Sequence, residues 1–440
     1  MDDYMNEKNE AENRDKSKTQ IDVSEDMTAW KRKTSLFLSS QALSLFGSSL
    51  VQYAITWYIT IKTQSGIMMT IAIICGFLPT FFLSPFAGVW ADRFNRKHLI
   101  IISDSFIAIS TLVLALLFML GYQATWLLFA AMSLRAIGSG IQSPAVSAII
   151  PQIVPKKHLS RINALNSSAH SFVSLLSPLL SGALLSIAPI ESVFFIDVVT
   201  AAIAVFFLSV FLHVPPHKKA LQKTNTGYFS DLKLGVKYIW KHDFIRLFFI
   251  FCAVFFFLAA PACFLTPLQV TRKFGNNVLH LTAIEIAFSI GMLVGGLIMA
   301  AWQGFRNKIH TVAMAGFVFS LFTVVLGFIP VFPVYLIIMG ILGLAMPFFN
   351  TPATVLFQQK VDPNYLGRVF GVLGMLTSSI MPLSMLLFGP LADIIKVDWI
   401  IIASGSLIFV VGLIVFFSKV LIEEGETDSL LESTAPQQFN

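Results

Sequence analysis

Twelve long apolar stretches constrain this 440-residue chain more than any other feature. A bilayer core of about 30 Å needs roughly 20 apolar residues per crossing helix. With 56% hydrophobic and 12% charged residues, the chain cannot be an ordinary soluble domain. An all-α polytopic membrane protein is therefore expected, with spans at Ser35–Ile61, Met68–Trp90, Leu99–Leu120, Trp126–Ile149, Ala164–Ile187, Ser192–Leu212, Ile245–Val270, Thr282–Trp302, Ile309–Phe328, Val334–Leu356, Val369–Ile394 and Asp398–Leu421.

Lysine and arginine residues concentrate in alternate loops between these spans. One set of loops holds about 21 of them and the other about four, namely Lys62, Arg272, Lys273 and Lys396. Basic loops stay in the cytoplasm, so both termini are expected there, with the protein in the cell membrane. The net charge of +6 reflects this bias and does not indicate nucleic-acid binding.

Charge and periodicity divide the chain into five parts. Residues 1–30 contain nine acidic and four basic residues without apolar periodicity, and they predict a disordered cytoplasmic tail. The other parts are a six-helix bundle over residues 31–212, a cytoplasmic linker over 213–244, a second bundle over 245–421 and a cytoplasmic tail over 422–440.

The linker contains one amphipathic segment, Tyr228–His242. Lys233, Lys237 and Lys241 recur every fourth residue beside an apolar row. This pattern predicts a helix lying in the membrane interface, with its lysines at the lipid headgroups. A solvated linker is the alternative.

The two bundles repeat each other. Four features recur at an offset of 207 or 208 residues: Ser143-Pro144-Ala145 with Thr351-Pro352-Ala353, Pro155 with Pro363, Leu159 with Leu366, and Arg161 with Arg368. Such repeats predict two six-helix halves, with a binding site at their interface near the membrane midplane.

The loop between the second and third spans carries a recognisable motif. Its sequence is Gly88-Val89-Trp90-Ala91-Asp92-Arg93-Phe94-Asn95-Arg96-Lys97. It resembles the signature loop of the major facilitator superfamily, although Asn95 stands where that family usually has glycine. The resemblance implies a gating role, in which Gly88 allows close helix approach and Asp92 accepts hydrogen bonds from Arg96 or a helix N-terminus. The alternative is that Arg93, Arg96 and Lys97 are only a topological anchor.

Further motifs make the resemblance narrower. They are Leu134-Arg135-Ala136-Ile137-Gly138, Phe194 to Asp197, Ile284-Glu285-Ile286-Ala287-Phe288, Gly291-Met292-Leu293 and Tyr365 to Phe370. Together they are similar to the macrolide efflux proteins of Gram-positive bacteria. The similarity covers about Trp30 to Leu421 and implies the major facilitator fold and proton-coupled drug export.

Four ionisable residues inside the spans are the candidates for proton coupling: Asp104, Arg135, Asp197 and Glu285. Arg135 and Asp197 could instead form a structural ion pair. Asp104 could be a structural partner of the Arg93–Lys97 cluster. Thr282-Ala283-Ile284-Glu285 has the pattern of a capping box, so Glu285 could simply cap a helix.

Polar rows on three spans are candidates for the walls of a cavity or for helix packing. The first span contributes Gln41, Ser44, Ser48 and Gln52, and the fourth contributes Arg135, Ser139 and Gln142. The fifth span carries a row that suits either cavity lining or close packing: Asn163, Asn166, Ser167, His170, Ser174, Ser177 and Ser181.

The expected function is proton-coupled export of amphipathic drugs by alternating access. The partners are then the lipid bilayer, a small amphipathic drug and protons. No cofactor, metal site or enzymatic activity is expected, and the sequence has no Walker-type loop for an ATP-driven pump. The alternatives are an uptake permease or lipid or metabolite transporter on the same fold, and a non-transporting accessory or sensor protein.

Overall fold

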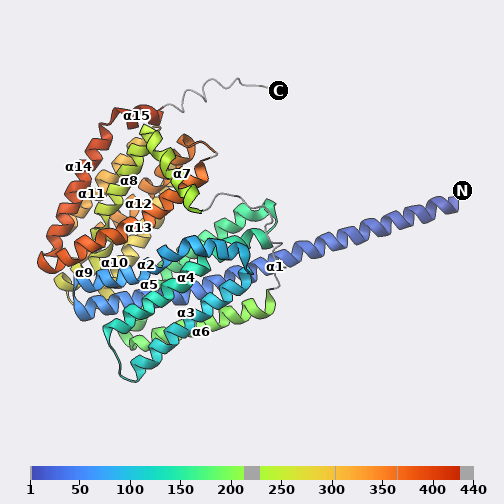
Figure 1. Cartoon of the computed structure of the whole chain (residues 1–440), viewed down its shortest axis with the longest axis horizontal. Helices are drawn as coiled ribbons and strands as arrows, with labels where there is room; N and C mark the ends of the chain where they lie inside the picture. The colour runs from blue at the N-terminus through green and yellow to red at the C-terminus, as the bar shows by residue number, and fades with distance from the viewer. Residues whose placement is uncertain (1, 213–227, 303, 364, 427–440) are drawn as a thin grey trace.

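A computed structural model describes residues 2–212, 228–302, 304–363 and 365–426, which are all helical or in short connections (Figure 1). The first half contains α1 (Asp2–Thr63), α2 (Gly66–Arg93), α3 (Arg96–Met119), α4 (Thr125–Ile153), α5 (Leu159–Ile187) and α6 (Ile190–Phe211). The linker contains α7 (Tyr228–Lys241). The second half contains α8 (Asp243–Phe264), α9 (Thr266–Phe274), α10 (Val278–Trp302), α11 (Lys308–Phe328), α12 (Phe332–Lys360), α13 (Leu366–Ile394), α14 (Val397–Phe416) and α15 (Lys419–Glu426).

The all-helical membrane architecture predicted from the sequence is confirmed. Ten helical segments in the described ranges are long and apolar enough to cross a membrane. The α8–α9 pair counts as one of them, from Asp243 to Phe274, because α9 follows α8 after a single residue. The two other expected spans are helical as well and lie in α1 and α4, so the number of twelve stays a prediction.

The amino-terminal tail differs from the expectation. Instead of a disordered tail, α1 continues as a helix back to Asp2, and this part projects away from the bundle (Figure 1). An α-helix satisfies its backbone groups locally, so a polar segment can form one without burying any surface. The helix α15 likewise extends into the expected carboxyl-terminal tail, of which residues 427–440 lie outside the described part.

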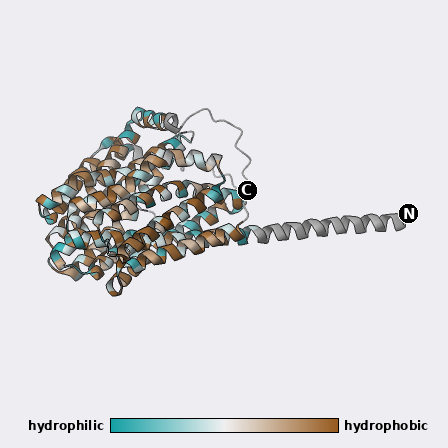
Figure 2. Cartoon of the chain, turned by 60° about the horizontal axis from the view of Figure 1, so that its bottom comes forward, coloured by the Kyte–Doolittle hydropathy of each residue, from teal (hydrophilic) through white to brown (hydrophobic). Residues whose placement is uncertain are grey.

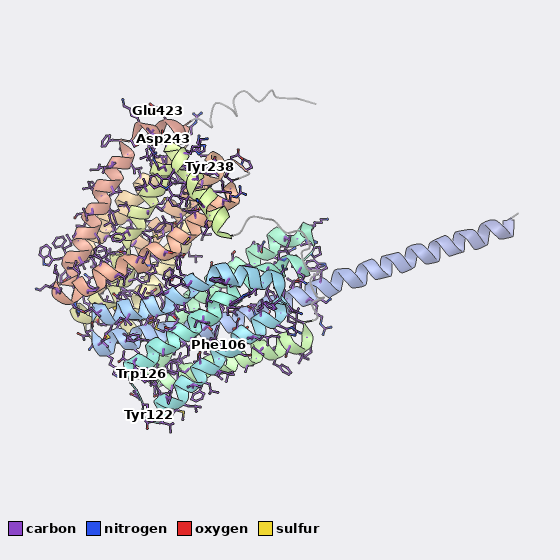
Figure 3. All side chains as sticks on the ribbon, viewed as in Figure 1. Phe106, Tyr122, Trp126, Tyr238, Asp243 and Glu423 are labelled. Carbon is purple, nitrogen blue, oxygen red and sulfur yellow. The ribbon has the colours of Figure 1, made fainter. Side chains whose placement is uncertain are left out.

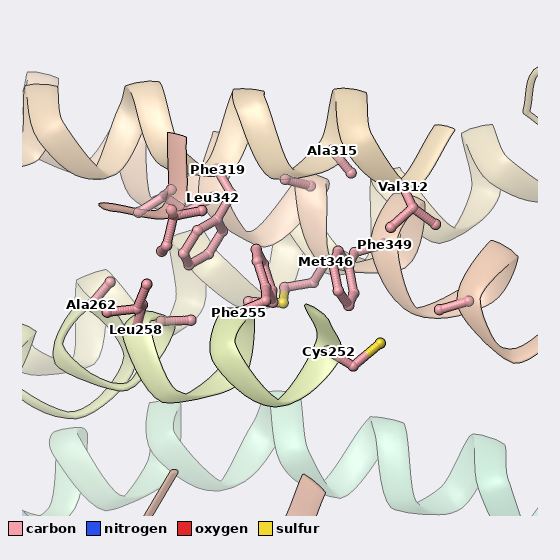
Figure 4. Packing of buried hydrophobic residues seen from close by; sticks show 14 of the residues in the cluster. Cys252, Phe255, Leu258, Ala262, Val312, Ala315, Phe319, Leu342, Met346 and Phe349 are labelled. Atoms are coloured by element: carbon pink, nitrogen blue, oxygen red, sulfur yellow. The ribbon is translucent and has the colours of Figure 1, made fainter. Parts of the chain in front are cut away.

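Apolar residues run along the helices of both halves (Figure 2), and many of the large ones are exposed. Each half also has an apolar interior. In the second half, the Phe255 and Phe349 rings stack 4.0 Å apart, and Phe319 packs 5.6 Å from Phe255 (Figure 4). This interior is close-packed, whereas the exposed apolar residues outside suit contact with lipid.

The two halves meet mainly at one end, here called the far end, through α2 with α13 and α5 with α10. A Cβ added to Gly66 would lie 2.1 Å from the carbonyl oxygen of Gly389. A Cβ on Gly182 would lie 1.7 Å from Thr282 Oγ1. Glycine is therefore required at both crossings, because any side chain would force the helices apart.

The opposite end, here called the linker end, carries α7. Gly235 packs against the backbone of Arg368, and the Tyr238 ring stacks 4.5 Å from that of Tyr365. Figure 3 shows Tyr238 at the opposite end of the molecule from Tyr122 and Trp126. The predicted linker segment forms the helix α7, which packs on the second half through one face, and its place in the membrane interface stays a prediction. Lys233, Lys237 and Lys241 are exposed on the other face.

Candidate functional site

An ion pair lies inside the first half. Arg135 Nη1 of α4 is 2.5 Å from Asp197 Oδ2 of α6, and both side chains are buried. Thr111 of α3 donates to the same carboxylate oxygen at 3.0 Å, and Ser48 of α1 donates to Oδ1 at 3.3 Å. Arg135 also donates to Thr111 Oγ1 and to the Ser48 carbonyl. The cluster thus joins four helices, as the structural ion-pair interpretation of Arg135 and Asp197 predicts.

Asp104 of α3 is a second buried acid with different surroundings. Its side chain is 1% exposed, and Oδ1 accepts hydrogen bonds from Ser44 Oγ at 2.7 Å and Gln142 Nε2 at 2.6 Å. Its other oxygen has no hydrogen-bond partner among the described atoms.

The predicted partnership of Asp104 with the basic loop is wrong for the two loop cations whose side chains are described. Lys97 Nζ donates to the Ser209 carbonyl, while Arg96 donates to the carbonyls of Ala91 and Ala148. These bonds fasten the loop to α2, α4 and α6 at the linker end. Arg96 and Lys97 bind these main-chain carbonyls and not the Asp104 carboxylate, because Asp104 lies two helical turns further into the membrane.

The polar row of the first span does not form one continuous wall. Gln41 and Ser44 are buried around Asp104, and Ser48 is bound to Asp197. Only Gln52 in this row is exposed. In α4, Ser139 is exposed, while Gln142 is half-buried and bound to Asp104. The predicted cavity candidates thus divide into two exposed residues and a set that solvates the buried acids.

Glu285 lies on α10, one turn from the crossing of Gly182 and Thr282 between the halves. The side chain is half-buried, and no described group forms a hydrogen bond or ion pair with it. Tyr53 of α1 and Cys263 of α8 are within electrostatic reach. The carboxyl group therefore lies between the halves without a counter-charge.

The capping-box interpretation of Glu285 is wrong. Helix α10 begins at Val278, and Asn277 Oδ1 accepts a hydrogen bond from Leu279 N at 2.9 Å. Thr282 therefore lies inside the helix, where its hydroxyl donates to the Val278 carbonyl. The Asn276-Asn277 pair was the sequence signal for the true start, since asparagine is a preferred N-cap residue.

The signature loop is described only in part. The side chains of Asp92 and Arg93 lie outside the described residues, so the Asp92 gating contact stays a prediction. Asn95 caps α3 by accepting from Lys97 N at 3.0 Å. No described atom lies within 4 Å of a Cβ built on Gly88, so the expected close helix approach at Gly88 is absent in this conformation.

The polar row of α5 serves both of its expected purposes, at different depths. Toward the far end, Ser177 and Ser181 are fully buried, and Ser181 donates to the Leu50 carbonyl. Toward the linker end, Ser167 and Ser174 are exposed. The row thus packs where the halves meet and is open where they part.

A polar contact between the halves at the far end was not found from the sequence. It consists of Asp393 at the end of α13, the Ser65-Gly66-Ile67 segment that begins α2, and Arg272 of α9, and is here called the far-end latch. Asp393 Oδ1 accepts from Gly66 N at 2.7 Å, and Oδ2 accepts from Ser65 Oγ at 2.7 Å and Ile67 N at 3.0 Å. Arg272 Nη2 is 3.0 Å from Asp393 Oδ1.

Two more groups strengthen this contact. Arg272 donates to the carbonyls of Ala392 and Gln64, one from each half. Thr70 of α2 donates to the Met385 carbonyl of α13 at 3.0 Å. A carboxylate at a helix N-terminus is favourable because it satisfies free N–H groups and the helix dipole. The far-end latch therefore uses the start of one half's helix as the binding site for the other half's acid.

Comparison with known proteins places this geometry in a family. The Major Facilitator Superfamily model matches residues 37–384. Macrolide efflux protein A of Streptococcus pyogenes is 29% identical over 387 residues, covering 88% of this chain and 95% of that protein. Multidrug efflux pump Tap of Mycolicibacterium fortuitum is 24% identical, covering 89% and 97%.

Solved structures agree on the fold. A bacterial homologue of the iron transporter ferroportin, in an inward-facing state, has a TM-score of 0.67 at 16% identity, covering 88% of this chain and 99% of that one. At this identity the likeness concerns the fold alone.

Proposed function

The chain belongs to the Major Facilitator Superfamily and is a multi-span membrane transporter, and from this premise we propose that it exports amphipathic, macrolide-like drugs across the cell membrane in exchange for protons. The similarity to Macrolide efflux protein A supports the substrate class. The mechanism is alternating access, in which the two halves rock about a site between them.

The observation that carries this proposal is the placement of the contacts between the halves. The described hydrogen bonds that cross from the α1–α2 connection and α2 to the second half all lie at the far end, from Gln64 to Thr70. The loop charges assign the linker end to the cytoplasm. On that assignment the conformation is open to the cytoplasm, from which an exporter loads its substrate.

Glu285 is the group proposed to bind the basic amine of the drug. Its carboxyl group is half-buried between the halves and has no described counter-charge. A charge in a membrane interior is costly unless it is paired, so a bound organic cation would be stabilised there by the carboxylate. The Tyr53 ring offers an aromatic surface on the opposite half.

The test uses erythromycin, a macrolide with a basic amine, and inside-out vesicles containing the protein. The wild type should accumulate the drug, and a protonophore should abolish the accumulation. Glu285→Gln should lose accumulation because glutamine cannot carry the negative charge, whereas Glu285→Asp should retain part of it. Asp243→Asn is the control, since Asp243 is exposed and its partner among the described residues is Arg246.

Two results would contradict the proposal. Full accumulation by Glu285→Gln would exclude Glu285 as the amine-binding group. Accumulation that is insensitive to the protonophore would exclude proton exchange as the driving reaction.

A further inference from the structure

Asp104 and its neighbours form a polar site that is separate from the Arg135–Asp197 pair. The site is built by three helices: α3 supplies Asp104, α1 supplies Gln41 and Ser44, and α4 supplies Gln142. Gln142 Nε2 donates to Asp104 Oδ1 at 2.6 Å and reaches Gln41 Oε1 at 3.5 Å. Asp104, Gln41 and Ser44 are less than a tenth exposed.

Two atoms of this site have unused hydrogen-bonding capacity. Asp104 Oδ2 and Gln41 Nε2 are buried, and neither forms a hydrogen bond of good geometry with a described group, although the Gln41 amide is near enough to the carboxyl group to favour its ionised form. An unsatisfied buried polar group is costly, and native proteins seldom keep one without a reason. An acceptor oxygen that lacks a well-aligned donor, on a carboxyl group that is itself buried, points to a ligand as small as a proton.

The described charged groups around Asp104 do not supply a counter-charge. From α4 the nearest cation is Arg135, which is bound to Asp197 of α6, so these two charges largely cancel. From α1 only the neutral Gln41 and Ser44 contact the carboxyl group. From α2 the ionisable residues at its end are Asp92 and Arg93, whose side chains lie outside the described residues.

We propose that Asp104 is the proton-binding site of this transporter. The proton adds to Oδ2 and gives a neutral carboxylic acid, which avoids an unpaired charge in the buried site. The new O–H can donate to the Gln41 amide oxygen if that amide rotates by half a turn, which gives up the long 3.5 Å contact of Gln41 Oε1 with Gln142 Nε2. No bond other than this O–H is formed or broken.

Proton binding also gives Asp104 a connection to movement of the helices. The ionised carboxylate accepts strong hydrogen bonds from Ser44 of α1 and Gln142 of α4. A neutral acid accepts them more weakly, so protonation loosens α3 from both neighbours. The Arg135–Asp197 pair does not need to change, and it keeps α1, α3, α4 and α6 together.

The inference rests on the proposed proton exchange for its role in transport, but proton binding can be measured without substrate. Infrared difference spectra of the purified full-length protein in lipid nanodiscs, recorded against pH, report the carbonyl band of neutral carboxylic acids. We expect a band in the wild type that is absent from Asp104→Asn and unchanged in the control Asp243→Asn. A native-fold Asp104→Asn protein that retains the whole band would overturn the assignment.

A second pair of variants covers the case in which Asp104→Asn fails to fold. Ser44→Ala and Gln142→Met each remove a donor that favours the ionised carboxylate. The neutral band should then persist to higher pH in both variants, and an unchanged pH dependence would count against Asp104. If the band disappears when sodium replaces choline in the buffer at constant pH, the site binds sodium instead.

The transport experiment distinguishes the assignment of Asp104 from the proposed drug export. Asp104→Asn should reduce erythromycin accumulation to that of protein-free vesicles while it preserves downhill exchange of the drug. If the wild type itself does not accumulate erythromycin, the proposed function fails, and the infrared band still decides the assignment of Asp104. Full accumulation by Asp104→Asn would exclude Asp104 as the coupling site.

Discussion

Replacing Asp393 with asparagine should weaken the contact that holds the halves together at the far end. The aspartate receives three hydrogen bonds from the start of α2 and one from Arg272. Asparagine keeps one acceptor oxygen and turns an N–H₂ group toward the other donors. The variant therefore loses about half of these bonds and the charge that favours the helix N-terminus.

The magnitude follows from these contacts. A hydrogen bond to a charged group contributes about 1.5–3 kcal/mol when well shielded from water. The Asp393 and Arg272 side chains are 22% and 31% exposed, so solvent reduces this value. We expect a loss of roughly 1–3 kcal/mol, or about 5- to 150-fold in the ratio of the conformation closed at the far end to the one open there.

Alkylation of a cysteine on α5 measures this ratio. Ser171 is exposed and lies 11 residues before Gly182, about three helical turns away on the same face. In a protein with the three native cysteines replaced by alanine, Ser171→Cys should react with an impermeant maleimide in inside-out vesicles. Asp393→Asn should slow this reaction, because it favours the conformation that is closed at the linker end. In that conformation the face of α5 that carries residue 171, which contacts α10 at the far end, becomes buried.

The control for this experiment is Asp243→Asn, which makes the same chemical change at an exposed ion pair of the linker end. Its reaction rate should equal that of the unchanged parent. An Asp393→Asn protein that reacts as fast as the parent, or faster, would refute the argument that the far-end latch stabilises the conformation open at the linker end.

Two further changes test the Arg135–Asp197 pair and the crossing of α2 with α13. Arg135→Gln should lower the free energy of unfolding by about 3–5 kcal/mol because it leaves Asp197 buried without a counter-charge. Adding Asp197→Asn should recover most of the lost stability, and equal thermal stability of the single and double variants would contradict the pairing. Gly389→Ala should slow the alkylation of Ser171→Cys, since its Cβ would lie 1.6 Å from Thr70 Oγ1 and push α2 away from α13. An unchanged rate would contradict this, because it would show that the α2–α13 crossing accommodates the added methyl group.

Much of the fold could be predicted from the sequence because lipid leaves few choices. Each expected span is helical, although Ile245–Val270 runs across α8 and α9 and Asp398–Leu421 runs past the end of α14 into α15. Even the linker helix was placed within one residue of its carboxyl end. The duplicated features predicted the two repeated halves, but they did not predict that these halves would meet through α2 with α13 and α5 with α10. Hydropathy and repeat offset suffice here, since backbone hydrogen bonding in a bilayer admits almost only helices.

The sequence was weaker on what each polar residue does. It named Asp104, Arg135, Asp197 and Glu285 correctly as unusual, because ionisable residues are costly in a membrane. It could not tell that Asp197 lies against Arg135 while the described partners of Asp104 are neutral. Both acids have similar apolar neighbours along the chain, and their partners come from other helices.

The sequence by itself therefore determined the all-helical membrane architecture and the family, and it predicted the two repeated halves, all of which depend on local hydropathy and on short motifs. The tertiary structure alone decided the capping of α10, the solvation of the buried acids and the far-end latch. In that latch Ser65 and Asp393 meet across 328 residues of chain. Such a contact depends on how each helix is rotated and tilted against the other half. Those angles follow from side-chain packing over whole helix surfaces, which no short segment of sequence specifies.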